Sequence, residues 1–227
     1  GGPARNISRF SRASVIGLNN NQYQVTRAGQ LTKNEGLQDR VSFVKGDFMH
    51  QPFEDNSFDA VYQIEATAHA PDKVKCYAEI FRVLKPGQLF ASYEWCMTEK
   101  HDPTNPKHVK AKKDIEEGNA LPDIFTTDQV VEALEQVGFE VLERDDLAAS
   151  YNPEIEYPWY YHLVPSYVSP YRFQFTGAGR FVATKGLNAM EMVGLMPKGS
   201  SGVSSFLNTG AQGLVVGGQL ETFTPMF

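Results

Sequence analysis

FDAVYQIEATAHAP, residues Phe58–Pro71, is the stretch from which the fold of this sequence follows. An apolar, β-branched run ends there in a carboxylate, an imidazole and a proline, with small residues between them. This pattern is typical of a buried strand that delivers polar groups to its carboxyl end, where open α/β sheets bind ligands. A strand followed by a capped helix, with Glu65 and His69 merely hydrogen-bonded, gives the same pattern, so the neighbouring segments must decide.

Strands and helices are predicted to alternate on both sides of that stretch. Buried strands are predicted at Ser14–Leu18, Val41–Val44, Leu89–Trp95 and Phe139–Leu142. Helices are predicted at Ala4–Ser11, Gln22–Leu31, Asp72–Leu84, Lys107–Gly118 and Asp128–Val137. We expect Lys85-Pro86-Gly87 to end the third helix, Thr127 to cap the last one and Gly138 to end it. This alternation predicts an α/β fold with a Rossmann-like, mostly parallel sheet and right-handed crossovers.

The composition changes beyond Ser150, where aromatic residues crowd a proline-bearing segment that extends to Phe175. Such density fits core packing, an apolar pocket or a membrane-surface face. Two further helices are predicted, at Arg180–Val193 and from Val203 to a stop at Gly217-Gly218. We therefore expect one domain over residues 1–149 and a smaller α+β or helical module over 150–227. The polar segment 98–121 is predicted to be either a solvated excursion or a lid.

Composition excludes several classes of protein. The net charge is −6 and no long basic run occurs, which argues against a nucleic-acid partner. Two cysteines, Cys76 and Cys96, are too few for a disulfide framework or a metal site, and they fit a reducing compartment. No apolar run is long enough to span a membrane, and no signal segment opens the chain. The start on glycines without an initiator Met indicates a fragment whose first strand is missing.

Polar residues after the first strands suggest a nucleotide or adenosyl ligand. Gly1 and Gly2 would allow the backbone to approach a ligand closely, and the helix amides behind them would face an anion. Asn19 or Asn20 stands where a ribose hydroxyl would be bound. Asp47, which precedes Phe48, could accept a hydrogen bond from an exocyclic adenine amine, although a plain turn residue would also fit there.

Several motifs together resemble the S-adenosylmethionine-dependent sterol 24-C-methyltransferase family, and the resemblance covers the whole chain. They are GGPAR at Gly1–Arg5, GLNNN at Gly17–Asn21, GDF at Gly46–Phe48, IEATAHAP at Ile64–Pro71, YEW at Tyr93–Trp95 and FTPMF at Phe223–Phe227. The IEATAHAP and YEW motifs are the specific ones. Ala68 departs from the family pattern, in which cysteine is frequent, and Gln88 stands where a second glycine is frequent.

The resemblance implies a domain of the class I methyltransferase type over residues 1–149, lacking its first strand, and a sterol methyltransferase C-terminal module over 150–227. It implies S-adenosylmethionine as the cofactor and methyl transfer to C24 of a Δ24 sterol in sterol biosynthesis, with no metal. The predicted cofactor-binding residues are Gly1, Gly2, Asn19, Asn20, Asp47 and Phe48. A sterol substrate also implies a location on the cytosolic face of the endoplasmic reticulum or a lipid droplet, by peripheral association. A homo-oligomer stays open.

The reaction assigns roles to the residues that leave the central strand. Glu65 is predicted to stabilise positive charge or act as the base, and His69 to be its partner or its alternative. The two side chains would face one cleft if the chain is helical from Ala66 onward. Tyr62, Tyr93 and Trp95 are the predicted aromatic walls. Glu94 is either a second carboxylate for the substrate or a structural residue.

Three other functions compete with this interpretation. A related methyltransferase could act on another lipid or on a quinone-like acceptor. A nicotinamide-dependent oxidoreductase could use the same kind of sheet, although the Tyr-x-x-x-Lys pair of such enzymes is absent. The chain could also be an inactive fragment or a non-catalytic partner subunit.

Overall fold

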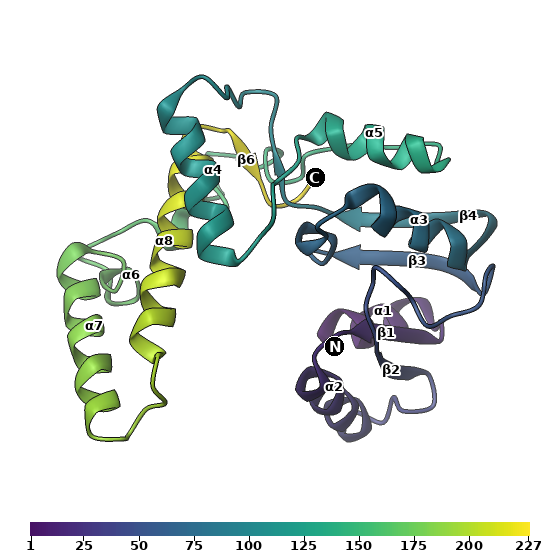
Figure 1. The fold of residues 1–227 in the computed structure, drawn as a ribbon, viewed down its shortest axis with the longest axis horizontal. Coiled ribbons are helices and arrows are strands. Elements are labelled where there is room, and N and C mark those ends of the chain that lie inside the picture. The colour runs from purple at the N-terminus through teal and green to yellow at the C-terminus, as the bar shows by residue number, and fades with distance from the viewer. The chain divides into compact units, whose positions relative to one another are not determined.

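A computed structural model describes residues 1–227, and the chain forms two compact units. The first unit comprises Gly1–Val61 and Val74–Phe90, and the second comprises Tyr62–Lys73 and Ala91–Phe227. Figure 1 labels the helices and strands. The expected domains at residues 1–149 and 150–227 stay a prediction.

The first unit opens with two helices and two parallel strands in the predicted order. These elements are α1 (Gly2–Ser11), β1 (Val15–Asn19), α2 (Gln22–Asn34) and β2 (Val41–Lys45). In the parallel register, Val15 lies opposite Val41 and Asn19 lies opposite Lys45. Since the two strands run in one direction, their carboxyl ends meet at the same edge. The predicted alternation of helix and strand is confirmed here.

The next strand pair is also parallel. It consists of β3 (Phe58–Ile64) and β4 (Leu84–Tyr93), joined through α3 (Lys73–Val83). The N–H groups of Asn56 and Ser57 donate to the carbonyls of Arg82 and Val83, so both segments run in the same direction. Hydrogen bonding joins the strands in pairs, β1 with β2 and β3 with β4. The predicted α/β class with parallel strands is confirmed.

The third helix ends before Lys85-Pro86-Gly87, as predicted, but the predicted strand at Leu89–Trp95 has the wrong bounds, because β4 already begins at Leu84 and ends at Tyr93. Gly87 has a φ of +74°, which lies in the left-handed region that favours glycine. The Pro–Gly pair therefore lies within the strand as a local irregularity, and α3 ends before it at Val83.

Two further predictions fail around α5 (Thr127–Val137). The cap is Thr126, whose side chain accepts from the N–H of Gln129, while the Gln129 side chain accepts from the N–H of Thr126. Both threonines suit a cap in sequence, and the glutamine three residues on decides for the first. Residues 139–142 form no strand: Phe139 donates its N–H back to Leu134, and Leu142 is 71% exposed.

In the second unit, α4 (Pro106–Asn119) packs along α8 (Ser200–Gln219), as Figure 1 shows. Small residues bring the two backbones together: a Cβ on Gly118 would collide with the backbone nitrogen of Gly210. A Cβ on Gly213 would lie 2.7 Å from the nitrogen of Ile115, which is fully buried. The inner face of α4 is therefore part of a packed helix pair, and a solvated excursion over residues 98–121 is the wrong alternative for it.

The predicted end of the last helix at Gly217-Gly218 is also wrong, since α8 continues to Gln219. Both glycines are buried within it. A Cβ on Gly217 would lie 3.1 Å from the Cβ of Phe223, and one on Gly218 would collide with the ring of Tyr160. These glycines allow close packing and do not terminate the helix.

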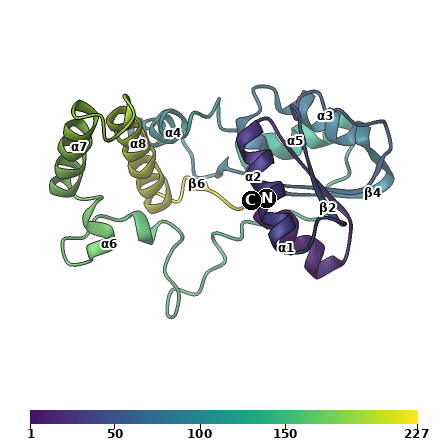
Figure 2. The same cartoon turned by 90° about the horizontal axis from the view of Figure 1, so that it is seen from below.

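Beside α8 lies α7 (Gly177–Met192), which begins after the cap residue Thr176 and confirms the predicted helix at Arg180–Val193. Figure 2 shows the two helices as a hairpin. The short η2 (Tyr161–Leu163) and α6 (Pro170–Phe173) precede it.

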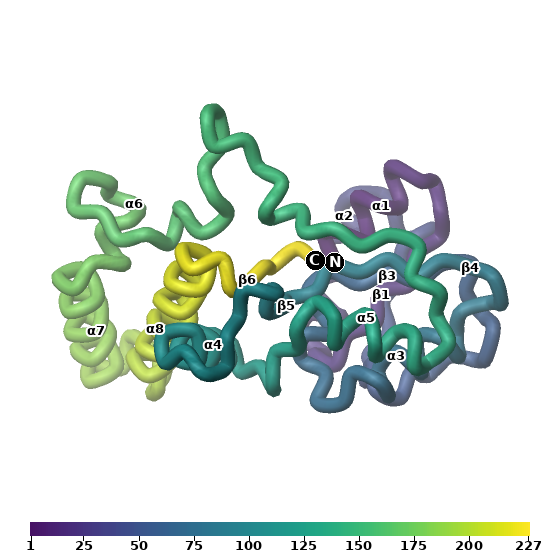
Figure 3. The backbone as a smooth tube through the Cα atoms, turned by 90° about the horizontal axis from the view of Figure 1, so that it is seen from above, coloured from purple at the N-terminus to yellow at the C-terminus, as the bar shows by residue number.

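The C-terminal residues complete the core of the second unit. The strand β6 (Phe223–Thr224) pairs antiparallel with β5 (Cys96–Met97), as can be followed in Figure 3. The core contains Met97, Ile115, Ile124 and Phe223, with Trp95 and Trp159 packed against it. The aromatic residues beyond Ser150 are thus partly core, as with Trp159, and partly surface, as with Tyr171, which is 86% exposed.

The α4–α8 contact predicts the effect of adding one methyl group. Gly118→Ala should lower the free energy of unfolding by about 1–3 kcal/mol, because the methyl group meets backbone that cannot move aside. Gly186→Ala in α7, where a Cβ would meet nothing within 4 Å, should instead raise it by about 0.5–1 kcal/mol. Chemical denaturation of both variants measures the difference. An equally stable Gly118→Ala variant would contradict the close helix contact.

Candidate active site

In the first unit, the predicted cofactor residues of β1 and β2 lie at one edge. Asn19 is the last residue of β1, and Asp47 comes two residues after β2. The N–H of Gly46 donates to the carbonyl of Asn19 at 3.1 Å, which joins the two strand ends. The structure therefore brings Asn19 and Asp47 together at the carboxyl edge of this strand pair.

The side chains at this edge differ in how far they are already engaged. The Asn19 amide donates to Gln24 at 2.8 Å, and its oxygen accepts from the N–H of Asn21 at 2.8 Å, so it fixes the start of α2. Asp47 accepts from the N–H of Met49 at 2.8 Å through Oδ1, which is a turn interaction. Its Oδ2 lies 3.9 Å from His50 Nδ1 and its side chain is 61% exposed, so this oxygen can still accept a hydrogen bond from a ligand. Asn20 is exposed.

The two opening glycines have different environments. A Cβ on Gly1 would lie 2.8 Å from the Cβ of Ala28, so glycine is needed there for packing against α2. A Cβ on Gly2 would meet nothing within 4 Å, which leaves the backbone open to a ligand. No side chain caps α1, and since Pro3 has no N–H, the N–H groups of its first turn that can face an anion are those of Gly2 and Ala4. Phe48 is half-buried.

In the second unit, β3 ends in a sharp turn that carries Glu65 and His69. Glu65 has a φ of +53°, in the left-handed region that a residue with a side chain rarely adopts. Its N–H donates to the carbonyl of Tyr93 at 3.0 Å. A single 3-10 turn, η1 (Thr67–His69), follows, so the expected helical continuation is only one turn long.

Both predicted catalytic side chains lie at the surface. Glu65 and His69 are exposed, and no hydrogen bond or ion pair holds either side chain. We expected them to face one cleft, and the structure corrects this: both side chains are exposed, and the turn that carries them enters the left-handed region at Glu65. Their catalytic roles stay predictions.

Four buried polar side chains lie beneath this turn, and we call Gln63, Thr67, Lys73 and Glu94 the buried polar cluster. All four are at most 8% exposed. Lys73 Nζ donates to the carbonyl of Thr67 at 2.7 Å and lies 3.3 Å from Glu94 Oε2. The Thr67 hydroxyl donates to the same Glu94 oxygen, and Glu94 Oε1 accepts from the N–H of Trp95 at 3.2 Å.

The fourth member of the cluster, Gln63, holds the turn through its amide. Its Nε2 donates to the hydroxyl of Ser92 and, at 2.7 Å, to the carbonyl of Tyr93. Its Oε1 accepts from the N–H groups of Ala66 and Thr67 at 2.8 and 3.2 Å. The side chain therefore satisfies backbone groups that the turn takes out of the strand ladder.

The sequence did not predict a role for Gln63, Thr67 or Lys73. A glutamine near the end of an apolar strand was the one available signal, whereas a lysine at the start of a helix is normally solvated. Glu94 was considered, and the structure favours its structural alternative, because its carboxylate is 1% exposed and paired with Lys73. Removing one partner of such a buried pair costs about 3–5 kcal/mol.

The three aromatic residues predicted to line the substrate site lie in different environments. Trp95 packs edge-on against Phe223, with ring centroids 5.4 Å apart, and its buried indole N–H has no hydrogen-bond partner. Tyr62 is half-buried, and this burial raises the pKa of its phenol. Tyr93 is 37% exposed. Tyr62 and Tyr93 therefore keep surface that a ligand can contact, while Trp95 belongs mainly to the core.

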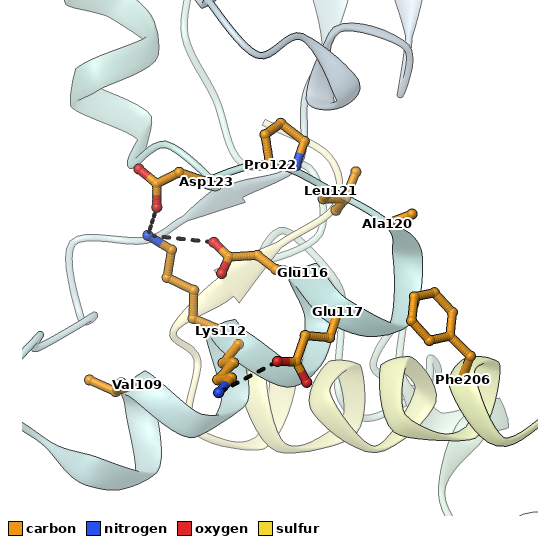
Figure 4. Close-up of a pocket in the computed structure, with 10 residues that line it drawn as sticks. Val109, Lys112, Glu116, Glu117, Ala120, Leu121, Pro122, Asp123 and Phe206 are labelled. Carbon is orange, nitrogen blue, oxygen red and sulfur yellow. Dashed lines mark hydrogen bonds and ion pairs between the residues drawn. The ribbon is translucent and has the colours of Figure 1, made fainter.

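A hollow of about 740 Å³ lies elsewhere in the second unit, between α4 and the segment that follows it (Figure 4). Lys112 lies 2.6 Å from Asp123 and 3.7 Å from Glu116, and Lys113 lies 3.5 Å from Glu117. Its lysines and carboxylates are thus paired with one another, and none of the predicted site residues lines it. No group of three side chains in the chain could hold a metal ion, and none of the helices could cross a bilayer.

Comparison with known proteins gives two family matches. A family model of a methyltransferase domain matches residues 1–92, and one of a sterol methyltransferase C-terminal region matches residues 171–227. The cycloartenol-C-24-methyltransferase 1 of Oryza sativa subsp. japonica is 52% identical over 227 residues, which are 100% of this chain and 65% of that protein. The sterol 24-C-methyltransferase of Saccharomyces cerevisiae is 47% identical over 233 residues, covering 100% of this chain and 60% of its own length. The chain thus spans less than two thirds of these relatives.

Solved structures show the same fold. A sarcosine dimethylglycine methyltransferase candidate from Galdieria sulphuraria superposes with a TM-score of 0.68 at 22% identity, covering 99% of this chain and 71% of that one. The geranyl diphosphate C-methyltransferase of Streptomyces coelicolor A3(2) gives a TM-score of 0.60 at 17% identity, with 66% and 53% covered. From these matches, the chain has a class I methyltransferase fold and is similar along its whole length to sterol C-24-methyltransferases.

Proposed function

We propose that this chain is the part of a sterol C-24-methyltransferase that carries its donor-side strands and its reacting side chains. The observation that supports this most is the match along the entire chain to relatives named for methylation at C-24, at 52% and 47% identity. Similarity to methyltransferases along the whole chain argues against the alternative that it is a nicotinamide-dependent oxidoreductase. Methylation of another lipid or of a quinone-like acceptor is a weaker alternative, because the C-terminal family match is specific to sterol methyltransferases.

The residues of the first unit fit S-adenosylmethionine as the donor. An open carboxylate oxygen on Asp47 can accept from an exocyclic amine, and the exposed Asn20 can reach a ribose hydroxyl. The free N–H groups at the start of α1, beside the open backbone at Gly2, suit the carboxylate of the donor's amino-acid part. When bound, S-adenosylmethionine supplies a methyl group that leaves its sulfonium while the bonding electron pair stays on sulfur.

The acceptor needs alignment rather than deprotonation. The electron pair of the sterol's Δ24 double bond forms the new carbon–carbon bond at C24, and positive charge develops on the neighbouring carbon. Alignment alone can lower such a barrier by up to about 7–11 kcal/mol. The cation must be kept from water, so we propose that the bound sterol covers Glu65 and His69, which are exposed in this structure.

Loss of a proton completes the reaction. A base removes a proton from a carbon next to the cation, and the electron pair of that C–H bond forms the product alkene. We propose Glu65 as the charge stabiliser or base and His69 as its partner or alternative. Tyr62 and Tyr93 present aromatic surface that can steady the cation through their π faces.

The proposed role of Glu65 predicts the effect of removing its charge. In the complete protein, Glu65→Gln should lower kcat by at least about 100-fold, the usual scale of a lost general base, because the amide neither stabilises a cation nor takes a proton. Binding of S-adenosylmethionine should be unchanged. A radiolabelled methyl-transfer assay with a panel of Δ24 sterols measures the turnover. Turnover at the wild-type rate would remove Glu65 from the mechanism, and a fully active His69→Ala variant would do the same for His69.

The donor site predicts the effect of changing Asp47. Asp47→Ala should weaken binding of S-adenosylmethionine by about tenfold, the value of one hydrogen bond to a charged group. Calorimetry on the complete protein measures the affinity. The matched control is Asp59→Ala, since Asp59 is an exposed carboxylate of the same unit that pairs only with Lys85. Equal affinity of both variants would place the donor elsewhere.

We also propose that the protein associates peripherally with a lipid surface, at the cytosolic face of the endoplasmic reticulum or of a lipid droplet. Met192, Val193 and Leu195 protrude where α7 turns into α8 and are 86%, 68% and 74% exposed. Residues 157–220 carry four Lys and Arg side chains and one carboxylate, although the whole chain is acidic. That carboxylate, Glu191, accepts from the N–H groups of Gly199 and Ser201, which lower its pKa. Exposed apolar residues within a cationic segment suit an anionic lipid surface.

The lipid proposal predicts binding to vesicles. The chain should sediment with phosphatidylcholine vesicles that contain phosphatidylserine, and Val193→Asp with Leu195→Asp should weaken this by about tenfold or more, because apolar burial is lost. Leu142→Asp, which changes an equally exposed leucine elsewhere, is the control. If instead the double change dissolved a dimer and left sedimentation unaltered, the face would be an interface between two copies.

A further inference from the structure

We infer that Lys73 and Glu94 are positioning residues which, through Thr67 and Gln63, hold Glu65 and His69 in place for the methyl-transfer reaction. This inference rests on the proposed function, since it assumes that the two exposed side chains meet the substrate. We place neither Lys73 nor Glu94 in contact with the substrate. Their effect passes through the backbone of the turn between β3 and α3.

The turn cannot hold its shape by itself. Glu65 lies in the left-handed region, a conformation that costs a residue with a side chain about 1–2 kcal/mol relative to glycine. The Glu65 carboxylate makes no hydrogen bond that would offset this cost. A strained conformation of this kind persists only where the surroundings determine it, and such conformations are concentrated at functional sites.

Those surroundings are the buried polar cluster. Gln63 holds the turn from the strand side by accepting from the N–H groups of Ala66 and Thr67. Lys73 and Glu94 hold it from the interior of the unit, and both of them form hydrogen bonds with Thr67. The Lys73 ammonium donates a hydrogen bond to the Thr67 carbonyl, and the Glu94 carboxylate accepts one from the Thr67 hydroxyl.

Thr67 is therefore the residue at which the buried charges act on the turn. It lies two residues after Glu65 and two before His69, so a shift at Thr67 moves both side chains. Its hydroxyl and its carbonyl are both engaged, which fixes the side chain and the peptide plane together.

Stability alone does not explain a charged pair at this position. Lys73 and Glu94 are 2% and 1% exposed, and apolar residues of similar volume often replace a buried ion pair without loss of stability. Hydrogen bonds to ionised groups are short and directional, so such a pair fixes position better than apolar packing does. We therefore assign to the Lys73–Glu94 pair the role of fixing the position of the turn.

The first test removes one hydroxyl. In the complete protein, Thr67→Val should lower kcat by about 10–100-fold, the effect of misplacing reacting groups by roughly 1 Å, with the KM for S-adenosylmethionine unchanged. Thr67→Ser, which keeps the hydroxyl, should restore kcat. Hydrogen exchange should show faster exchange at the amides of Ala66 and Thr67 only in the valine variant.

A matched control separates positioning from general destabilisation. Thr176 is also buried, and its hydroxyl donates to the carbonyl of Phe173 and accepts from the N–H of Gly179. Thr176→Val should lower the thermal midpoint and leave kcat of the folded protein unchanged. If Thr67→Val behaved in the same way, its role would be structural and the inference would be overturned.

The second test removes both buried charges. Lys73→Met combined with Glu94→Gln leaves no unpaired ion, so the protein should stay folded while kcat falls and the turn amides exchange faster. Wild-type kcat in this folded double variant would overturn the inference. Its failure can be told from failure of the proposed function: an inactive Glu65→Gln variant beside a fully active double variant rejects only the positioning role, whereas an active Glu65→Gln variant rejects both.

Discussion

The second unit depends on how the backbone is satisfied where β3 ends. Once the chain enters the left-handed conformation at Glu65, the N–H groups of Ala66 and Thr67 point away from the strand ladder, and a buried backbone group without a partner is costly. The side chain of Gln63 accepts hydrogen bonds from these two N–H groups, and Lys73 donates one to the carbonyl of Thr67. The lysine then requires Glu94, because burying an ammonium without a carboxylate partner is costly. One irregular turn thus accounts for the buried polar residues around it.

Much of the fold follows from local sequence, because hydrophobic periodicity and capping residues act within short segments. The helices at α1, α2, α3, α5 and α7 and the strands β1, β2 and β3 were predicted close to their observed bounds for this reason. The buried polar cluster could not be predicted in the same way. Its contacts join residues 63–73 to residues 92–95, and a lysine at a helix start looks like any solvated cation until the partner segment is known.

The glycines show where local sequence stops being informative. Gly138 was predicted to end a helix, and it does so with a φ of 112°. Gly217 and Gly218 gave the same signal, yet they lie within α8, because Phe223 and Tyr160 occupy the space that a side chain would need. A glycine needed for its backbone conformation cannot be told from one needed for close packing without the packing partner. The missing strand at residues 139–142 has a similar cause, since an apolar segment becomes a strand only where a neighbour can pair with it.

The same cluster separates the roles of the two carboxylates near the turn. Glu94 lies beside the Lys73 ammonium and accepts from Thr67 and from the N–H of Trp95, so its negative charge is already balanced. Burial raises the pKa of the nearby Cys96 thiol, and the negative charge of Glu94 raises it further, so the thiol stays neutral. Glu65 has no such partner, and its carboxylate is exposed. A cation that develops on a substrate is stabilised most by a charge that no other group has neutralised. Of the two, Glu65 is therefore the carboxylate that we propose for the reaction, and Glu94 is the one that we propose to hold the turn in place.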